Sequence, residues 1–131
     1  MVTVIKSKQL RVDGKYEPPM KVGFGIDSTS VANTNAVMGY TTAAAGDRLQ
    51  RHFHTNTSVV QYVVKGRTLM SFGPDHEKKE VIVEAGDFIF IPRGEIHGAS
   101  SLEDGAVVFC YTEVASKEEA GTIFIEPPHK K

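Results

Sequence analysis

The sequence predicts an all-β protein built as an antiparallel sandwich or barrel, and three observations support this class. Apolar and polar residues alternate in short segments such as Lys21–Ile26 and Glu80–Glu84, as they do in half-buried strands. Turn signals such as Asp13-Gly14 and Gly86-Asp87 separate these segments at regular intervals. No stretch has a convincing helical pattern. Many short strands joined by glycine- and proline-rich turns are typical of all-β sandwiches and barrels.

The first half of the chain is expected to form five strands. A short segment beginning at Leu10-Arg11-Val12 precedes the Pro18-Pro19 turn, and the polar stretch from Asp27 to Asn35 is predicted to be a loop at a pocket mouth. The three alanines from Ala43 run directly into Gly46-Asp47, so they are interpreted as a turn rather than a helix. The expected strands are Val2–Ile5, Lys21–Ile26, Ala36–Thr42, Leu49–His54 and Ser58–Lys65.

The second half is expected to form five further strands and one helical turn. The helical turn is predicted over Ser116–Ala120, with Ser116 as its N-cap. His76 lies in the turn after Pro74 and is expected to be solvated. The expected strands are Thr68–Gly73, Glu80–Glu84, Phe88–Ile91, Ala106–Val114 and Thr122–Glu126, followed by a charged tail in which His129 is expected to be disordered.

Composition limits the classes of protein and partner. The chain has 131 residues, a length typical of one domain with a single core. Its net charge of −1 provides no field that would attract nucleic acid or acidic lipid headgroups. The sequence contains neither a signal peptide nor an apolar stretch long enough to span a membrane. Cys110 is the single cysteine, which excludes an internal disulfide, and the expected compartment is the cytoplasm.

Three histidines form the candidate metal site. In an extended strand His52 and His54 point to the same face, with Cα atoms roughly 6.6 Å apart. Two imidazoles at that separation can converge on one ion at metal–nitrogen distances of about 2.0–2.1 Å. Pro92 and Gly94 force the chain to turn just before His97, which is the best candidate for a third ligand.

The spacing around these histidines resembles that of the cupin family. The first cupin motif, G-x5-H-x-H-x3/4-E-x6-G, and the second, G-x5-P-x-G-x2-H-x3-N, match at Gly46, His52, His54, Gly66, Gly86, Pro92, Gly94 and His97. Two positions depart from the family. The glutamate position falls on Val59, or on Ser58 with the shorter spacing, and the final asparagine position is Ser101. A three-histidine site therefore remains, without the motif's anionic ligand.

The resemblance implies a fold and a cofactor. It implies an antiparallel double-stranded β-helix, or jelly-roll barrel, formed by residues 1–131 as a single cupin domain with its metal-site motifs at 46–66 and 86–101. It also implies one divalent metal ion held by His52, His54 and His97. Fe(II) is the expected ion for an enzyme, and Zn(II), Ni(II) and Cu(II) also suit such a site.

Alternation along the strands suggests further pocket residues. Counting by twos from His52 places Arg48 and Gln50 on the inward face, provided that the strand has no bulge. The same counting from Val59 places Gln61 inward, either as a ligand or substrate partner or as a core glutamine bonded to backbone. Glu95 is a second candidate for the fourth ligand, although a surface position also fits it. Apolar pocket walls, or ordinary core, are expected from Tyr40, Phe90, Met38, Phe88, Phe109 and Tyr111.

Two main classes of function follow from the resemblance, and a third stays open. Three-histidine cupins resemble iron dioxygenases, so the first is a dioxygenase-type enzyme acting on a small anionic or enolisable substrate. The second is a non-catalytic module that binds or senses a small ligand. The third is an isomerase or cyclase that uses the metal as a Lewis acid. A homodimer is also expected, because Val2–Ile5 and Thr122–Glu126 are terminal strands whose edges invite pairing.

Overall fold

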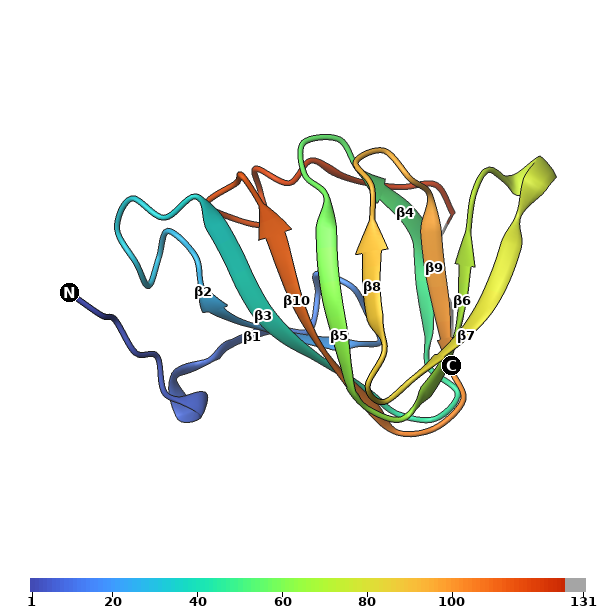
Figure 1. The fold of residues 1–131 in the computed structure, drawn as a ribbon, viewed down its shortest axis with the longest axis horizontal. Coiled ribbons are helices and arrows are strands. Elements are labelled where there is room, and N and C mark those ends of the chain that lie inside the picture. The colour runs from blue at the N-terminus through green and yellow to red at the C-terminus, as the bar shows by residue number, and fades with distance from the viewer. Residues whose placement is uncertain (127–131) are drawn as a thin grey trace.

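Eleven β-strands in two antiparallel sheets make up the computed structural model, which describes residues 1–126 (Figure 1). The six-stranded sheet contains, in spatial order, β1 (Arg11–Asp13), β2 (Lys21–Ile26), β3 (Ala36–Ala43), β10 (Gly105–Thr112), β5 (Val59–Lys65) and β8 (Phe88–Ile91). The five-stranded sheet contains β11 (Thr122–Phe124), β4 (Arg48–His54), β9 (His97–Ser101), β6 (Arg67–Phe72) and β7 (Lys79–Glu84).

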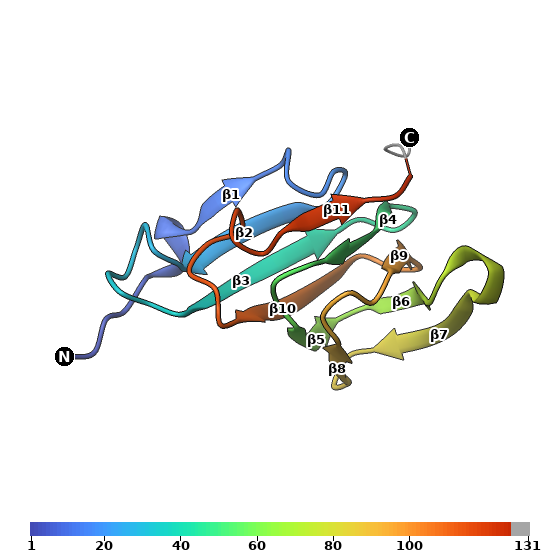
Figure 2. The same cartoon turned by 90° about the horizontal axis from the view of Figure 1, so that it is seen from above.

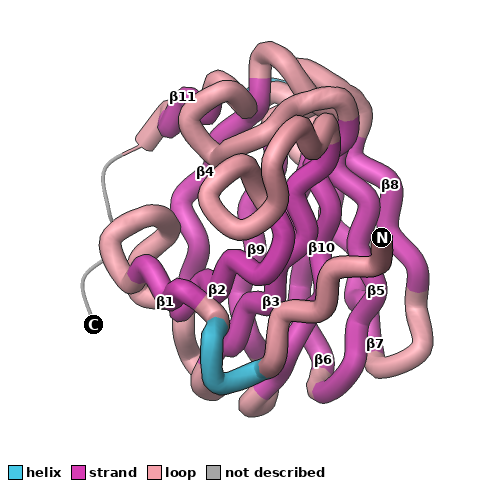
Figure 3. The backbone as a smooth tube through the Cα atoms, turned by 90° about the vertical axis from the view of Figure 1, so that its left-hand side faces the viewer, coloured by secondary structure: helices cyan, strands magenta, loops and turns pink. Residues whose placement is uncertain are grey.

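The described residues contain no α-helix, which confirms the all-β prediction. Two single turns of 3-10 helix, η1 (Ser7–Gln9) and η2 (Asp75–Glu77), are the helical elements, and Figure 3 shows how small a part of the backbone they form. From β3 to β6 and again from β7 to β11, consecutive strands alternate between the sheets, as in a jelly-roll barrel. No helix within residues 1–126 is long and apolar enough to cross a membrane.

Most of the expected strands are present. The strand β9 at His97–Ser101 was not predicted, and the other main differences lie near the chain ends. Residues 1–6 belong to no strand, although Val2–Ile5 alternates, and this N-terminal segment extends away from the barrel (Figures 1 and 2). Val2 and Val4 are exposed there. Alternation of apolar and polar residues produces a strand only where a neighbouring strand supplies hydrogen bonds. The last strand ends at Phe124 rather than Glu126. The prediction for His129 lies outside the described residues.

The helical turn predicted over Ser116–Ala120 is a hydrogen-bonded turn instead of a helix. The Ser116 hydroxyl still accepts a bond from the Glu119 N–H at 3.2 Å, as an N-cap side chain would. Ala120 N–H donates to the Lys117 carbonyl at 3.2 Å, and no further turn follows before β11. The predicted cap is therefore present without the helix.

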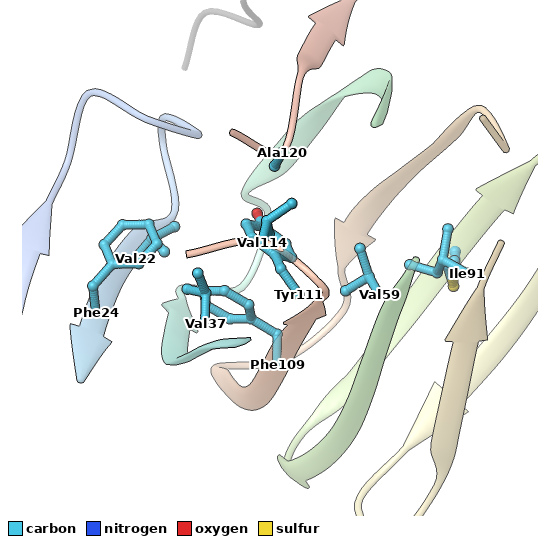
Figure 4. Packing of buried hydrophobic residues seen from close by; sticks show 10 residues of the cluster. Val22, Phe24, Val37, Val59, Ile91, Phe109, Tyr111, Val114 and Ala120 are labelled. Atoms are coloured by element: carbon cyan, nitrogen blue, oxygen red, sulfur yellow. The ribbon is translucent and has the colours of Figure 1, made fainter. Parts of the chain in front are cut away.

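The apolar core fills the space between the two sheets (Figure 4). Phe24 on β2 packs edge-on against Phe109 on β10, with ring centroids 5.9 Å apart. Gly39 on β3 makes room for this pair, because a Cβ there would lie 2.5 Å from both the Phe109 ring and the Gly23 carbonyl oxygen. The buried cluster comprises Val22, Phe24, Val37, Val59, Met70, Ile91, Phe109, Tyr111, Val114 and Ala120.

A bulge in β4 sets the direction of the first two histidines. Leu49 pairs with Ala99 on β9, and His52 pairs with His97. Two residues of β4 therefore lie between these pairs, but only one residue of β9 does. The extra residue of β4 reverses the inward and outward alternation of side chains between Leu49 and His52. The side chains that face the barrel interior are thus Leu49, His52 and His54.

Candidate metal centre

Three buried histidines from two neighbouring strands meet inside the barrel. His52 and His54 lie on β4, and His97 lies opposite His52 at the start of β9. One ring nitrogen from each lies within 4.8 Å of the others, and the His52 and His97 ring centroids are 4.2 Å apart. The exposed fractions are 1% for His52, 3% for His54 and 5% for His97. The predicted trio is therefore brought together by the fold.

The Nδ1 atom of each ring already has a hydrogen-bond partner. His52 Nδ1 lies 2.7 Å from the Gln50 carbonyl oxygen, and His97 Nδ1 lies 2.9 Å from the Glu95 carbonyl oxygen. Since a carbonyl only accepts, both rings carry their proton on Nδ1 when neutral and keep a free lone pair on Nε2. His54 Nδ1 lies 2.8 Å from the Thr122 hydroxyl. Ligating histidines in proteins are oriented by such bonds, so the three rings fit a metal ion.

Burial keeps two of the three rings neutral. Burial first and the charge of His52 second lower the pKa of His54 to about 3. The pKa of His97 is also lowered to about 3, by burial first and by the charge of His52 second. Neutral imidazoles are the form that binds metals, so these environments favour coordination over protonation.

A carboxylate that no motif predicted lies beside the trio. Glu17, in the turn between β1 and β2, places Oε2 3.2 Å from His52 Nε2. Its side chain is only 11% exposed. Burial lowers the pKa of His52, but the hydrogen bond and charge of Glu17 raise it, and the net shift is upward. The motif's glutamate is absent as predicted from Val59, and Glu17 was missed because neither motif contains a signal for this residue.

Three hydroxyl groups connect the Glu17 turn to the histidines. Tyr16 OH lies 2.9 Å from Tyr111 OH on β10 and 2.9 Å from the Thr122 hydroxyl on β11. Thr122 in turn contacts His54 Nδ1. Burial raises the pKa of both tyrosines, so their phenols stay protonated near neutral pH. The turn, both sheets and the trio thus share one polar network within an otherwise apolar interior.

The histidines open onto a cavity of about 100 Å³. Val59 and Gln61 line it, as predicted, and Glu95 does not: its contribution is the backbone carbonyl that orients His97. Among the described residues no Lys or Arg side chain lines the cavity. Its walls are mostly apolar, contributed by Met20, Leu49, Val59, Met70, Val83, Ile89, Ile91, Val107 and Phe109.

Four predicted pocket residues lie elsewhere. Because of the β4 bulge, Arg48 is exposed, and the Gln50 side chain donates to the Glu126 carbonyl at 2.6 Å. Gln50 still serves the site through its own carbonyl, which orients His52. Tyr40 and Phe90 are 37% and 64% exposed, on the outer face of the six-stranded sheet, where β3 and β8 turn alternate residues away from the interior. Of the other expected wall residues, Phe109 and Tyr111 line the cavity, and Met38 and Phe88 are exposed.

Several solved structures share this fold. Oxalate decarboxylase from Bacillus subtilis aligns with a TM-score of 0.78 at 14% identity, over 95% of this chain and 32% of that one. The chain therefore spans about a third of that enzyme. The polyketide cyclase RemF from Streptomyces resistomycificus aligns with a TM-score of 0.76 at 17% identity, over 97% of this chain and 87% of that one. Streptomyces PAC13 with uridine aligns with a TM-score of 0.77 at 12% identity, over 98% and 95% of the two chains.

Identities this low show a shared fold alone. A search of curated protein sequences finds no match to this chain. The family model of the cupin domain, however, matches residues 39–115, which is more than half of the chain and includes all three histidines. Together with the jelly-roll architecture, this match shows that the chain belongs to the cupin domain family.

Proposed function

We propose that this cupin is a divalent-metal enzyme in which His52, His54 and His97 hold the ion. The observation that carries the proposal is the orientation of the three buried rings, whose Nδ1 atoms are engaged and whose Nε2 atoms are left to converge on one cavity. When bound, the ion supplies Lewis acidity and, in the case of Fe(II), oxygen chemistry. Fe(II) is the expected ion, and Zn(II), Ni(II) and Cu(II) suit the same nitrogen ligands.

The cavity favours a small substrate with an apolar body and one anionic or enolisable group. Its small volume and its valine, isoleucine and methionine walls suit a hydrocarbon portion. With no Lys or Arg lining it among the described residues, the substrate's negative charge has to be met at the ion. A dianion such as oxalate would lack a second cationic partner there, so an enolisable dicarbonyl or a monoanionic acid fits better than oxalate.

The dioxygenase-type reaction is tested by metal analysis followed by oxygen uptake. We expect the purified protein to contain one metal ion per chain and the Fe(II)-loaded form to consume O2 with a small β-dicarbonyl. The variant with His52→Ala and His54→Ala should lose the metal and the uptake while retaining its β-sheet circular dichroism. A double variant that retains stoichiometric metal would refute the assignment.

A metal-dependent cyclase or isomerase is the second candidate. It is favoured by the likeness to RemF, which extends over nearly the full length of both chains, and by the phenols of Tyr16 and Tyr111, which place exchangeable protons close to the trio. Conversion of an enolisable substrate under anaerobic conditions would support this reaction. Tight ligand binding with no conversion under either aerobic or anaerobic conditions would instead support a binding or sensing module.

We also propose a homodimer, and we place the protein in the cytoplasm. The two terminal strands do not support the dimer as expected. β11 pairs with β4 of its own chain, and residues 2–5 form no strand. The support is now the outer face of the six-stranded sheet, which presents apolar side chains from three strands beside the free edge of β8. They are Met38 and Tyr40 of β3, Val60, Tyr62 and Val64 of β5, and Phe88 and Phe90 of β8, each more than a third exposed.

A further inference from the structure

We propose that Glu17 is the fourth, anionic ligand of the metal, supplied from a turn that lies outside both cupin motifs. The inference rests on the proposed three-histidine site and concerns a residue that neither motif contains. It assigns to the turn between β1 and β2 the role that the family pattern gives to a glutamate of β5, where this chain has Val59.

The distance between Glu17 and His52 is the first argument. Two ligands of one ion, each bonded at about 2.1 Å with an angle of about 90–109° between them, are separated by about 3.0–3.4 Å. Glu17 Oε2 and His52 Nε2 are 3.2 Å apart. The Nε2 atom is also the one that the Gln50 carbonyl leaves free for a metal. The carboxylate oxygen and the histidine nitrogen are therefore spaced as neighbouring ligands of one ion.

The surroundings of the carboxylate are the second argument. Glu17 is 8% exposed and lines the same apolar cavity as the trio, where the described residues provide no lysine or arginine. A carboxylate in such surroundings is costly to keep charged unless a cation or several donors compensate it. Its contact with His52 Nε2 provides one donor only when that ring is protonated. A divalent ion at the trio would satisfy Glu17 and His52 together.

Val59 leaves the motif's carboxylate position apolar. Val59 is 2% exposed and packs into the buried cluster while lining the cavity, so that wall is apolar where the motif places its carboxylate. Glu17 approaches from the N-terminal turn instead, and its charge also acts on His97 and Tyr111. The site would then contain three neutral nitrogens and one carboxylate, which lowers the net charge of a divalent centre to about +1.

The test compares metal binding by wild type and variants, with Co(II) and Zn(II) as probes. Glu17→Gln keeps the side-chain shape and removes the charge. We expect its affinity, measured by chelator competition, to fall by about tenfold to a hundredfold or more, since even partners that only orient a ligand contribute that much. The Co(II) absorption bands should shift, because one oxygen ligand changes. Glu95→Gln is the matched control: it neutralises a carboxylate near His97 that does not line the cavity.

A second variant separates ligation from a structural role. Adding Val59→Glu to Glu17→Gln returns a carboxylate to the motif position in the same cavity, and we expect metal affinity to recover toward that of wild type. A Glu17→Gln variant with the affinity and Co(II) spectrum of the Glu95→Gln control would overturn the proposal, while the three-histidine assignment would stand if His52→Ala with His54→Ala still removes the metal. A wild-type protein that binds neither probe would overturn both.

Discussion

His52 differs electrostatically from the two histidines beside it. All three are buried, but Glu17 contacts only His52, and it raises the pKa of that ring while His54 and His97 stay neutral down to a pH of about 3. In the absence of metal, His52 is therefore the ring of the three that is most readily protonated. Metal binding to this trio has to displace that proton, so affinity should weaken as the pH falls.

The metal-free protein should lose stability in acid. The pKa values of His54 and His97 are about 3 when folded, and a histidine in the unfolded chain titrates near 6.5. Between these values the unfolded chain binds more protons, so the free energy of unfolding decreases as the pH falls, by up to about 1.4 kcal/mol per pH unit for each histidine. The raised pKa of His52 has the opposite effect on the free energy of unfolding. It stabilises the folded protein at low pH, and this stabilisation is lost as the pH rises.

Urea denaturation of the chelator-treated protein between pH 7 and pH 5 measures this slope. His54→Gln should make it shallower by about one proton, and replacing the exposed His76 by Gln should leave it unchanged. Equal slopes in all three proteins would contradict the prediction.

Thr122 should contribute to metal affinity without contacting the metal. Its hydroxyl lies between His54 Nδ1 and Tyr16 OH, at 2.8 Å and 2.9 Å. Thr122→Val keeps the shape but removes the partner that orients His54, so Zn(II) affinity should fall by about tenfold to a hundredfold. Thr41→Val, at another threonine that lines the cavity, is the control. Equal affinities in the two variants would show that His54 needs no such partner.

The three histidines of the site could be predicted from the sequence, and the carboxylate of Glu17 could not. His52, His54 and His97 lie in motifs whose spacing follows from strand geometry and one turn. Glu17 reaches the site from a turn 35 positions before His52, and a proline-rich turn carries no sign of which side chain it buries. Long-range approach of this kind depends on packing between segments, which a local pattern does not encode.

At the scale of elements, one β-bulge decides which residues face the cavity. Alternation along β4 placed Arg48 and Gln50 inward with the histidines, but the extra residue between Leu49 and His52 places Leu49 inward instead. Neither glycine nor proline marks the bulge, so the sequence offered no reason to expect it. Alternation held for Val59 and Gln61 because no bulge interrupts β5 between Val59 and Val63.

The contact of β2, β3 and β10 should tolerate no methyl group at Gly39. A Cβ there would meet the Gly23 carbonyl and the Phe109 ring at 2.5 Å, and backbone on one side cannot move aside cheaply. Gly39→Ala should therefore destabilise the fold by about 1–3 kcal/mol, as overpacking usually does. Gly14→Ala is the matched control, because nothing lies within 4 Å of its added Cβ. Thermal denaturation measures both, and equal midpoints would refute the steric argument.

At the scale of the whole molecule, the six-stranded sheet is apolar on both faces. Its inner face packs against the core and cavity, which alternation requires. The outer face was not expected to be apolar: the sequence predicts Tyr40 and Phe90 in the pocket wall or the core, but both are exposed. Sequence alone cannot distinguish a strand buried on both faces within one chain from a strand whose second face meets another chain.

The outer face of the six-stranded sheet should join two copies of the chain. Phe88 and Phe90 are 83% and 64% exposed on edge strand β8, and Tyr62 lies against Phe88 with ring centroids 4.8 Å apart. Exposed aromatic residues gathered on one sheet face are typical of a protein interface, and a second copy offers the same apolar face in return. Light scattering at micromolar concentration should therefore give twice the chain mass of 14.3 kDa.

Charges on that face should separate the two copies. Phe88→Asp with Phe90→Asp should give the monomer mass and keep the metal, since neither side chain lines the cavity. Ile82→Asp is the control, because Ile82 is 48% exposed on β7 of the other sheet and should remain dimeric when changed. A wild-type mass of 14.3 kDa, or a double variant as dimeric as Ile82→Asp, would show that copies do not meet on this face.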